Sequence, residues 1–550
     1  MKEILNFVTR LASIKGLCKN KFGDYGAGIL PAGEDRATSI PCQWVGKERA
    51  TKPAGKRPSQ NCRSCFCTVP KGLNIVCFGI DNSKTDNTIS TMKFIGRSQE
   101  LRFLEEHYAS KSAVLLPIYG RRRVGKSRLI DEFIRDKPCI YFLGKRMATE
   151  LQIKQFTEAA IPVVENAALA HASFTNWETA LKSITSLWKK DQKLLVVMDE
   201  LQWTAEAAPE LPSMLQALWD REWKQRGDLM IILCGSHVGF MEREILGSRS
   251  PLFGRRSDQI RLGPLPFREA IKMLPNYGEA DQAGVFFLVG GIPAYLERFQ
   301  SNGRSLHQAV TEEFCSELRF LALEPHFLLK EELREPARYF TILTQMATQR
   351  IRHKDLAQQC YLEPGVLAGY LETLLTLGYI GKTYPVLPGK TSPKQVQYEI
   401  IDPMLRFWFR FIFPNLQLCR PGQETAVFQQ QIAPQLESYF GARFEKLCQE
   451  GLVEDYRKKQ ILWQHVGQYW DRDMQLDVVG VRRDKWIDFG ECKWGDPGPL
   501  ISLADRLAKK CEQYPKKQGY SSGLHLYLKH KPRGNPPQNI QVHYLANLFE

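Results

Sequence analysis

The chain has 550 residues, of which 43% are hydrophobic and 25% are charged. One hydrophobic core does not organise a chain of this length, so about three or four domains are expected. The densest apolar stretch, LRFWFRFIF at 405–413, is short and contains two arginines, and the N-terminus has no long apolar segment of a secretory signal. This composition argues against membrane and secreted classes, and we expect a cytoplasmic protein without a membrane partner.

The formal net charge of +15 suggests an anionic partner, but much of it lies at the N-terminus. Residues 1–91 contain 14 basic and 7 acidic residues, whereas the remainder contains 61 and 53. The body of the protein is therefore only mildly basic, and charge alone gives little support for nucleic-acid binding.

Residues 1–91 differ from the rest of the chain in composition. They contain six of the 14 cysteines, including the cluster NCRSCFC, which could form half of a zinc site. No histidine precedes His107, and no second CxxC follows at a suitable distance, so zinc is disfavoured. With little periodicity and an ordered pattern that begins at Met92, this segment is interpreted as a disordered extension or as an upstream start codon read in error.

From Met92 onward, apolar strands alternate with helices. Ser98 is expected to cap the first helix, in FIGRSQELRFLEEHYA at 94–109. Buried strands are predicted at 113–120, 139–144, 193–200 and 229–236, with a helix at about 211–224. This alternation predicts an α/β domain at 92–265 with a parallel sheet covered by helices on both faces. A helical segment follows at 266–334.

The segment GRRRVGKS, directly after the first predicted strand, fits G-x-x-x-x-G-K-[ST] at every fixed position. Glycines allow backbone N–H groups to face phosphate oxygens, the lysine supplies a charge for the β- and γ-phosphates, and the serine hydroxyl binds Mg²⁺. The three arginines are expected to face solvent or phosphate rather than the core. ATP is therefore predicted to bind at Gly120, Arg121, Arg122, Arg123, Val124, Gly125, Lys126 and Ser127.

A second part of this site is predicted in LLVVMDE, the most hydrophobic strand. Asp199 ends the strand, where it can hold Mg²⁺ together with Ser127, and Glu200 is placed to orient and deprotonate the attacking water. An acidic pair at this position could also be no more than the start of a helix. With a phosphate-binding loop upstream, the sequence favours ATP hydrolysis.

These motifs closely resemble the archaeal-type ATPase family of the AAA+/STAND class of P-loop NTPases. The resemblance rests on FIGRSQEL, GRRRVGKS, LLVVMDELQW, ILCGSHVGFM, PLFGRRSDQIRLGPL and GGIPAYL, and covers about 92–300. It implies that Ser236 senses the γ-phosphate and that Arg255 contacts phosphate in the same or a neighbouring subunit, which makes an oligomer an open alternative. Ser236 could instead only bond the backbone, and Arg256 and Arg261 compete with Arg255. Gly290, Gly291 and Pro293 would form the turn of a helical lid.

The segment 335–415 contains helix, turn, helix and an apolar strand, a pattern typical of winged-helix domains, followed by an aromatic connection at 398–414. The second helix could enter a DNA groove. Between Pro364 and Leu377 it contains no Lys or Arg, so it lacks the cations that bind phosphate and read guanine. We therefore favour a packing role between domains.

The segment 432–550 contains a separate set of charged residues. Glu445 lies on a predicted amphipathic helix, Asp477 on the strand MQLDVVGV, and Glu491 and Lys493 on the strand WIDFGECKWG. Residues two apart on a strand share a face, so this order resembles the PD-(D/E)XK nuclease fold, which also ends many archaeal-type ATPases. Asp477 and Glu491 would share a metal, Glu445 would be a further ligand or hold the site, and Lys493 would orient or activate water for phosphodiester cleavage. The alternative is that these charges merely pair on a solvated edge strand.

Two functions remain open from the sequence. In the first, a Mg²⁺-dependent ATPase couples its nucleotide state to a C-terminal domain that acts on DNA or RNA, with possible cleavage by Asp477, Glu491 and Lys493. In the second, the protein is an ATP-gated scaffold whose nuclease-like domain only binds a partner. The three retained charged residues favour the first function, and the uncharged helix at 364–377 favours the second.

Overall fold

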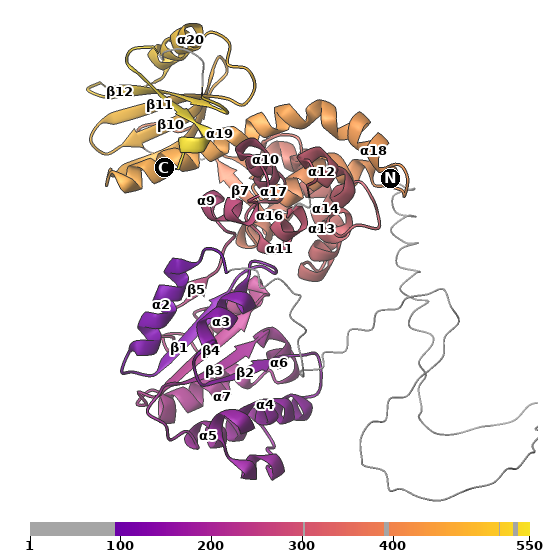
Figure 1. The fold of residues 1–550 in the computed structure, drawn as a ribbon, viewed down its shortest axis with the longest axis vertical. Coiled ribbons are helices and arrows are strands. Elements are labelled where there is room, and N and C mark those ends of the chain that lie inside the picture. The colour runs from indigo at the N-terminus through magenta and orange to yellow at the C-terminus, as the bar shows by residue number, and fades with distance from the viewer. Residues whose placement is uncertain (1–93, 301–302, 390–394, 516–517, 532–536, 550) are drawn as a thin grey trace, which may run out of the picture. The chain divides into compact units, whose positions relative to one another are not determined.

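The computed structural model describes residues 94–300, 303–389, 395–515, 518–531 and 537–549 (Figure 1). The proposed extension 1–91 and its cysteine cluster lie outside the described residues. The described residues belong to one compact unit, Ser90–Glu550. No helix among them is both long enough and apolar enough to cross a membrane.

The first part of the unit is a parallel five-stranded sheet with the strand order β2-β3-β4-β1-β5. Its strands are β1 (Val114–Tyr119), β2 (Cys139–Leu143), β3 (Leu194–Asp199), β4 (Leu229–Gly235) and β5 (Ile260–Arg261). All residues of β1, β3 and β4 are buried, as expected for the inner strands of a parallel sheet. The four predicted strands and their parallel pairing are confirmed.

Helices cover both faces of this sheet, and the alternation of side chains along β1 shows how. Leu116 and Ile118 pack in one cluster with Leu129 of α3, whereas Leu115 packs in a second cluster with Phe156 of α4. The helices are α2 (Ser98–Ala109), α3 (Lys126–Ile134), α4 (Thr149–Val164), α5 (Trp177–Ser186), α6 (Leu201–Ala207), α7 (Leu211–Leu218) and α8 (Val238–Phe240).

The predicted cap of α2 is wrong. Ser98 is the first residue of the helix, and Arg97 before it takes a left-handed conformation without a capping side-chain bond. Arg97 uses its side chain elsewhere: Nη2 donates to the carbonyl oxygens of Val124 at 3.2 Å and of Gly263 at 2.5 Å. The start of α2 is therefore set by an arginine that reaches two distant segments, which a local capping pattern does not reveal.

Short helices follow the sheet and lead to a small three-stranded antiparallel sheet with the order β6-β8-β7. The helices before it are α9 (Phe267–Ala270), α10 (Glu279–Val289), α11 (Pro293–Leu296), α12 (Leu306–Phe314), α13 (Phe320–Glu332) and α14 (Pro336–Met346). The next elements are β6 (Ile351–Arg352), α15 (His353–Gln359), α16 (Pro364–Thr376), β7 (Ile380–Thr383), β8 (Gln397–Ile400), α17 (Pro403–Phe407) and α18 (Glu424–Val427). The winged-helix assignment of this region stays a prediction.

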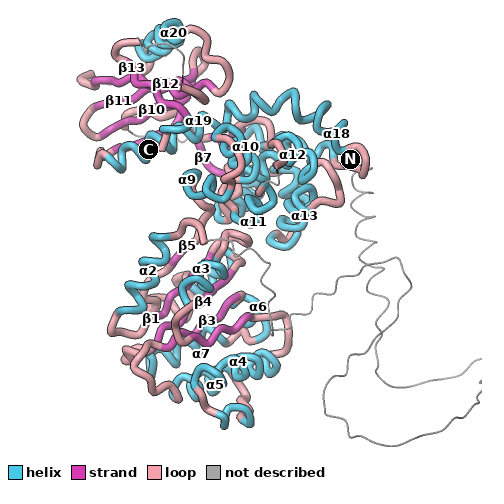
Figure 2. Tube along the Cα trace, viewed as in Figure 1, coloured by secondary structure: helices cyan, strands magenta, loops and turns pink. Residues whose placement is uncertain are grey.

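The C-terminal part contains another β-sheet, with both parallel and antiparallel strands, together with helices (Figure 2). Its elements are α19 (Ala433–Lys458), β9 (Trp463–Trp470), β10 (Gln475–Arg482), β11 (Trp486–Lys493), α20 (Leu500–Gln513), β12 (Ser521–Leu528) and β13 (Ile540–Tyr544). The sheet order is β13-β12-β11-β10-β9, with β9, β10 and β11 antiparallel and β11, β12 and β13 parallel. The strands β10 and β11 are thus interior strands.

The segment between Leu262 and Leu265 joins the first sheet to the helices that follow. Leu262 N donates to Tyr119 O at 2.7 Å, and Leu265 N donates to Gly291 O, also at 2.7 Å. Both contacts require glycine nearby, because a Cβ on Gly120 or on Gly291 would collide with the carbonyl oxygen of Leu262 or Leu265, respectively. We call residues 262–265 the strap.

The strap makes Gly291 a sensitive position. Gly291→Ala should lower the free energy of unfolding by about 2 kcal/mol or more, because backbone must move to admit the methyl group. Thermal unfolding of the full chain measures this loss. Gly263→Ala is the matched control, since a Cβ there meets nothing within 4 Å. Equal melting temperatures for the two variants would show that the contact between Gly291 and Leu265 adapts without cost.

Candidate functional site

The loop Gly120–Gly125 connects the end of β1 to the start of α3. Arg123 and Gly125 both have positive φ, at 68° and 91°, and Gly125 is the residue before the first turn of the helix. Left-handed residues in such a turn allow successive backbone N–H groups to face one anion, and the helix N-terminus adds to the attraction. The loop thus has the backbone form that phosphate binding requires.

Lys126 is buried, and its ammonium group is held by the loop itself. Nζ donates to Gly120 O at 3.0 Å and to Arg121 O at 2.9 Å. Burial lowers the pKa of Lys126, while the charges of Glu200 and Asp199 favour the protonated form. The lysine is therefore fixed against the loop, where it can exchange carbonyl partners for phosphate oxygens.

Ser127 and Asp199 meet at the end of β3. Ser127 Oγ donates to Asp199 Oδ2 at 2.8 Å, although the two residues are far apart in the sequence. Tyr141 OH donates to the same oxygen at 2.5 Å, and Glu200 N donates to Oδ1 at 2.8 Å. A hydroxyl and a carboxylate in contact beside a phosphate-binding loop are oxygen ligands suited to Mg²⁺. The residues predicted to hold this ion are thus adjacent.

Glu200 and Ser236 also lie together. Ser236 Oγ donates to Glu200 Oε2 at 2.6 Å, and Gln202 Nε2 donates to Ser236 Oγ at 3.1 Å and to the Glu200 carboxylate. Glu200 itself has a positive φ of 50°, which turns the chain sharply between β3 and α6. The structure therefore brings the predicted water-activating carboxylate and the predicted sensor into direct contact through adjacent strand ends.

The sequence predicts that the three arginines of the loop face solvent or phosphate rather than the core, and Arg121 differs from this prediction. Arg121 is buried and forms an ion pair with the buried Asp402, and its guanidinium lies 4.8 Å from the centre of the Tyr379 ring. Burial by itself would lower the pKa of Arg121, but the charge and hydrogen bond of Asp402, together with Tyr379 and Tyr295, raise it. Its partner lies 281 residues further along the chain, at the N-cap of α17, so no local sequence pattern could reveal that Arg121 is buried.

Arg122 and Arg123 also pair with distant carboxylates, both on α13. Arg122 Nη1 lies 2.5 Å from Glu331 Oε2, and Arg123 pairs with the buried Glu324. The Arg123 guanidinium also lies 4.5 Å from the centre of the Phe320 ring. Every arginine of the phosphate-binding loop is thus engaged by a helix outside the first sheet.

Arg255 is engaged by an acidic residue. Its Nε donates to both oxygens of Asp220, at 3.0 and 2.9 Å, and Nη1 donates to Pro251 O at 3.0 Å. Its competitors are also engaged, Arg256 with Leu246 O and Arg261 with Thr376 O. The contact of Arg255 with phosphate stays a prediction.

In the C-terminal part, Asp477 and Glu491 lie on neighbouring interior strands. The antiparallel register that pairs Val478 with Gly490 brings Asp477 opposite Glu491. Both are buried, at 7% and 8% exposure, so the alternative of a solvated edge strand does not hold. Burial first, and the Glu491 charge second, raise the pKa of Asp477.

Two lysines neutralise Glu491. Lys493 Nζ donates to Oε1 at 3.0 Å, and Lys510 Nζ from α20 donates to Oε2 at 2.8 Å. Asp477 Oδ2 accepts from Cys492 N at 3.0 Å. The sequence did not single out Lys510, although its position on an amphipathic helix directly after the E-x-K strand could have suggested a role.

Glu445 is near this pair but has a different partner. Gln468 Nε2 donates to Glu445 Oε2 at 2.5 Å, and burial together with the Asp477 charge raises the pKa of Glu445 to about 8. Across the described ranges, no three His, Cys, Asp or Glu residues form a group that could hold a metal ion. A metal ligand set that includes Glu445 is therefore not assembled, and ligation by Asp477 and Glu491 stays a prediction.

Other site residues could not be predicted from the sequence, because their contacts depend on how distant segments pack together. Tyr141 on β2 and Gln202 on α6 contact the acidic residues through the spacing of parallel strands. Arg97 bonds the loop residue Val124, and Asp402 pairs with Arg121. Tyr141 lies in the middle of β2, opposite Val197, so only the pairing of β2 with β3 places it near Asp199.

Comparison with known proteins follows the same division of the chain. Residues 94–299 match a family of ATPase domains found predominantly in Archaea, and residues 408–510 match a family of archaeal and bacterial proteins of unknown function. An uncharacterized protein of Methanocaldococcus jannaschii is 28% identical over 76% of this chain and 90% of its own length. An uncharacterized ATP-binding protein of the same organism is 48% identical over 8% of this chain and 75% of its own length.

Two solved structures are similar at lower identity. The Walker-type ATPase of Pyrococcus abyssi is 21% identical, with 58% of this chain and 96% of that chain covered and a TM-score of 0.44. The ORC2 protein of Aeropyrum pernix is 13% identical, with 66% and 97% covered and a TM-score of 0.36. From its loop, its strand order and this match, the chain carries a P-loop ATPase domain similar to those of the archaeal family, and residues 408–510 are similar to the second family.

Proposed function

We propose that the protein binds ATP with Mg²⁺ and hydrolyses it in the loop Gly120–Ser127. The observation that carries this proposal is the contact between Ser127 and Asp199 at 2.8 Å, beside the fixed ammonium of Lys126. Bound Mg²⁺, held by Ser127 and Asp199, would supply positive charge to the β- and γ-phosphates. Lys126 would bind the same phosphates directly, and Glu200 would orient and deprotonate the attacking water.

Lys126→Ala should abolish nucleotide binding, because the phosphates then lose their fixed cation. Glu200→Gln should still bind ATP but hydrolyse it at least about a hundredfold more slowly, since only the base is lost. Equilibrium binding and phosphate release measure the two effects separately. Lys111→Ala and Glu206→Gln, which change exposed residues, are the matched controls. Normal turnover by Glu200→Gln would remove this residue from the mechanism.

The nucleotide state is further proposed to act on the rest of the chain through the three loop arginines. Arg121 pairs with Asp402 on α17, and Arg122 and Arg123 pair with Glu331 and Glu324 on α13. Phosphates that enter the loop would compete with these carboxylates for the same guanidinium groups. A change at the loop would therefore alter the contacts of two helices that lead toward the C-terminal part.

Asp402→Asn tests this connection, because it removes the charge but keeps the cap that Asp402 Oδ1 gives to Leu405 N. Leaving Arg121 buried without a counter-charge should cost about 3 kcal/mol or more of unfolding free energy. ATP with Mg²⁺ should change the hydrogen exchange of α17 in the natural chain, and this change should be lost in Asp402→Asn. Lys126→Ala serves as the control without nucleotide. An unchanged ATP response in Asp402→Asn would contradict coupling through this pair.

For the C-terminal part, the proposed activity is metal-dependent cleavage of nucleic acid. Support comes from the element order helix, three antiparallel strands, helix, strand, together with Asp477 opposite Glu491 and two lysines beside them. Lysine beside a carboxylate pair can stabilise charge that develops on phosphate. The alternative is a non-catalytic partner-binding domain, which the neutralisation of Glu491 by Lys493 and Lys510 favours.

Glu491→Ala should abolish cleavage of DNA or RNA while ATP hydrolysis without nucleic acid stays near normal, because the residues of the two sites are distinct. Lys493→Ala should lose cleavage too, since it removes the charge that faces phosphate. Cleavage is assayed with Mg²⁺ and with Mn²⁺, and Glu512→Ala, an exposed acid on α20, is the control. Protein that binds nucleic acid but never cuts it with either metal would support the scaffold alternative.

A further inference from the structure

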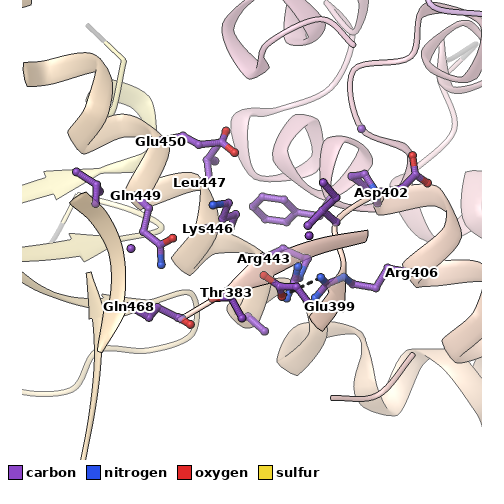
Figure 3. Close-up of a pocket in the computed structure, with 18 of the residues that line it drawn as sticks. Thr383, Glu399, Asp402, Arg406, Arg443, Lys446, Leu447, Gln449, Glu450 and Gln468 are labelled. Atoms are coloured by element: carbon purple, nitrogen blue, oxygen red, sulfur yellow. Dashed lines mark hydrogen bonds and ion pairs between the residues drawn. The ribbon is translucent and has the colours of Figure 1, made fainter. Parts of the chain in front are cut away.

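A cavity of about 680 Å³ lies next to the strap and contains none of the ATP-site residues (Figure 3). Its walls come from the turn at Gly290 and Gly291, from the strands β7 and β8 with the residues around them, and from α19 and β9. This volume is in the range of sites that hold a nucleotide-sized molecule. Many of its polar lining residues are basic.

Three arginines surround one carboxylate in the wall of this cavity. Arg406 Nη2 lies 3.0 Å from Glu399 Oε2, and Arg350 Nε lies 3.7 Å from the same oxygen. The charge of Arg443 also acts on Glu399, and the three cations together help to hold the pKa of Glu399 down against its burial. One carboxylate cannot neutralise three guanidinium groups, so this wall has an excess of positive charge.

Arg443 has a guanidinium atom without a hydrogen-bond partner in this wall. Its Nε is buried without an acceptor, and its charge interacts with those of Glu399 and Glu445. Burial and the neighbouring Arg406 lower the pKa of Arg443 to about 10, so it remains charged at neutral pH. A buried guanidinium N–H without an acceptor is costly unless a bound anion supplies one.

Lys446, one turn further along α19, adds an exposed ammonium to the same cavity. Two acids offset part of this charge: Glu450, one turn further along α19, interacts with Lys446, and Glu445 acts on Arg443. The other two acids are already engaged, Asp402 by Arg121 and Glu399 by arginines. Trp463 and Tyr384 supply aromatic surface at the same cavity, against which a flat base can stack.

We propose that this cavity binds a phosphate-bearing ligand of nucleotide size, with its phosphate held by Arg443 and Lys446. The ligand chemistry is a phosphate joined to a base, from either a free nucleotide or a nucleic-acid strand. Such a ligand would complete the bonds of Arg443 and balance the excess charge. This site goes beyond the proposed function, because it contains neither the P-loop nor Asp477, Glu491 or Lys493.

The cavity touches residues tied to both proposed active sites. Asp402 in its wall pairs with Arg121 of the P-loop, and Gln468 in its wall bonds Glu445 near Asp477. Gln468 also accepts from Arg350. A bound phosphate would therefore change the charge balance of groups that contact each site, which gives the ligand a regulatory position.

The test uses the full chain with Lys126→Ala, so that the P-loop does not compete for the probes. Calorimetric titration is run with AMP, with a 5′-phosphorylated tetrathymidylate, and with the same oligonucleotide bearing a 5′-hydroxyl. Saturable binding of at least one probe is expected. Adding Arg443→Gln should weaken it about tenfold or more, and Lys446→Gln should weaken it less. Adding Arg102→Gln, which changes an exposed arginine of α2, should leave it unchanged.

Binding of AMP that depends on Arg443 identifies a free nucleotide as the source, and binding of the oligonucleotides alone identifies a strand. No saturable binding of any probe overturns the proposal, as does binding that neither Arg443→Gln nor Lys446→Gln weakens. Should Arg443→Gln not fold, Lys446→Gln decides, because its side chain is exposed and its loss leaves the core intact. Loss of ATP hydrolysis by Glu200→Gln is independent of these titrations, so failure of either proposal is distinguishable.

Discussion

The ion pair between Arg121 and Asp402 is the interaction on which the arrangement of this chain most depends. It joins the phosphate-binding loop, next to β1, to the first turn of α17, and both partners are buried. A buried pair of this kind adds little net stability, but either charge alone is strongly unfavourable. The pair therefore specifies one arrangement of loop and helix, because any other would leave an enclosed charge without its partner.

Asp402 divides its two oxygens between two tasks. Oδ1 accepts from Leu405 N at 2.7 Å and caps α17, while Oδ2 accepts from Arg121. Tyr379 lies over the Arg121 guanidinium and donates its hydroxyl to Glu332. One cluster thus fixes the geometry of the loop, the cap of α17 and the packing of the segment after α16. Each buried polar side chain in this cluster has a partner that offsets the cost of its burial.

Sequence patterns predicted the first sheet well because its strands are continuous apolar segments bounded by glycine and polar turns. The phosphate-binding motif identified Ser127, and the end of an apolar strand identified Asp199, and the two side chains are in contact. Sequence patterns could not find the partners of Arg121, Arg122 and Arg123, which lie about 200 to 280 residues away along the chain. They also placed Glu445 in a metal group because spacing reports which strand or helix carries a residue, not which neighbour its carboxylate meets.

The strap at 262–265 has a mechanical consequence. Its backbone N–H groups at Leu262 and Leu265 donate to the end of β1 and to the glycine turn. Between them, the carbonyl oxygen of Gly263 accepts a hydrogen bond from Arg97. At both ends the partner is a main-chain atom, and no side chain fills the gap. Main-chain atoms have no rotamers that could absorb a shift, so we expect the phosphate-binding loop and the turn before α11 to move together. A displacement of a few tenths of an ångström at one end should be transmitted to the other without slack.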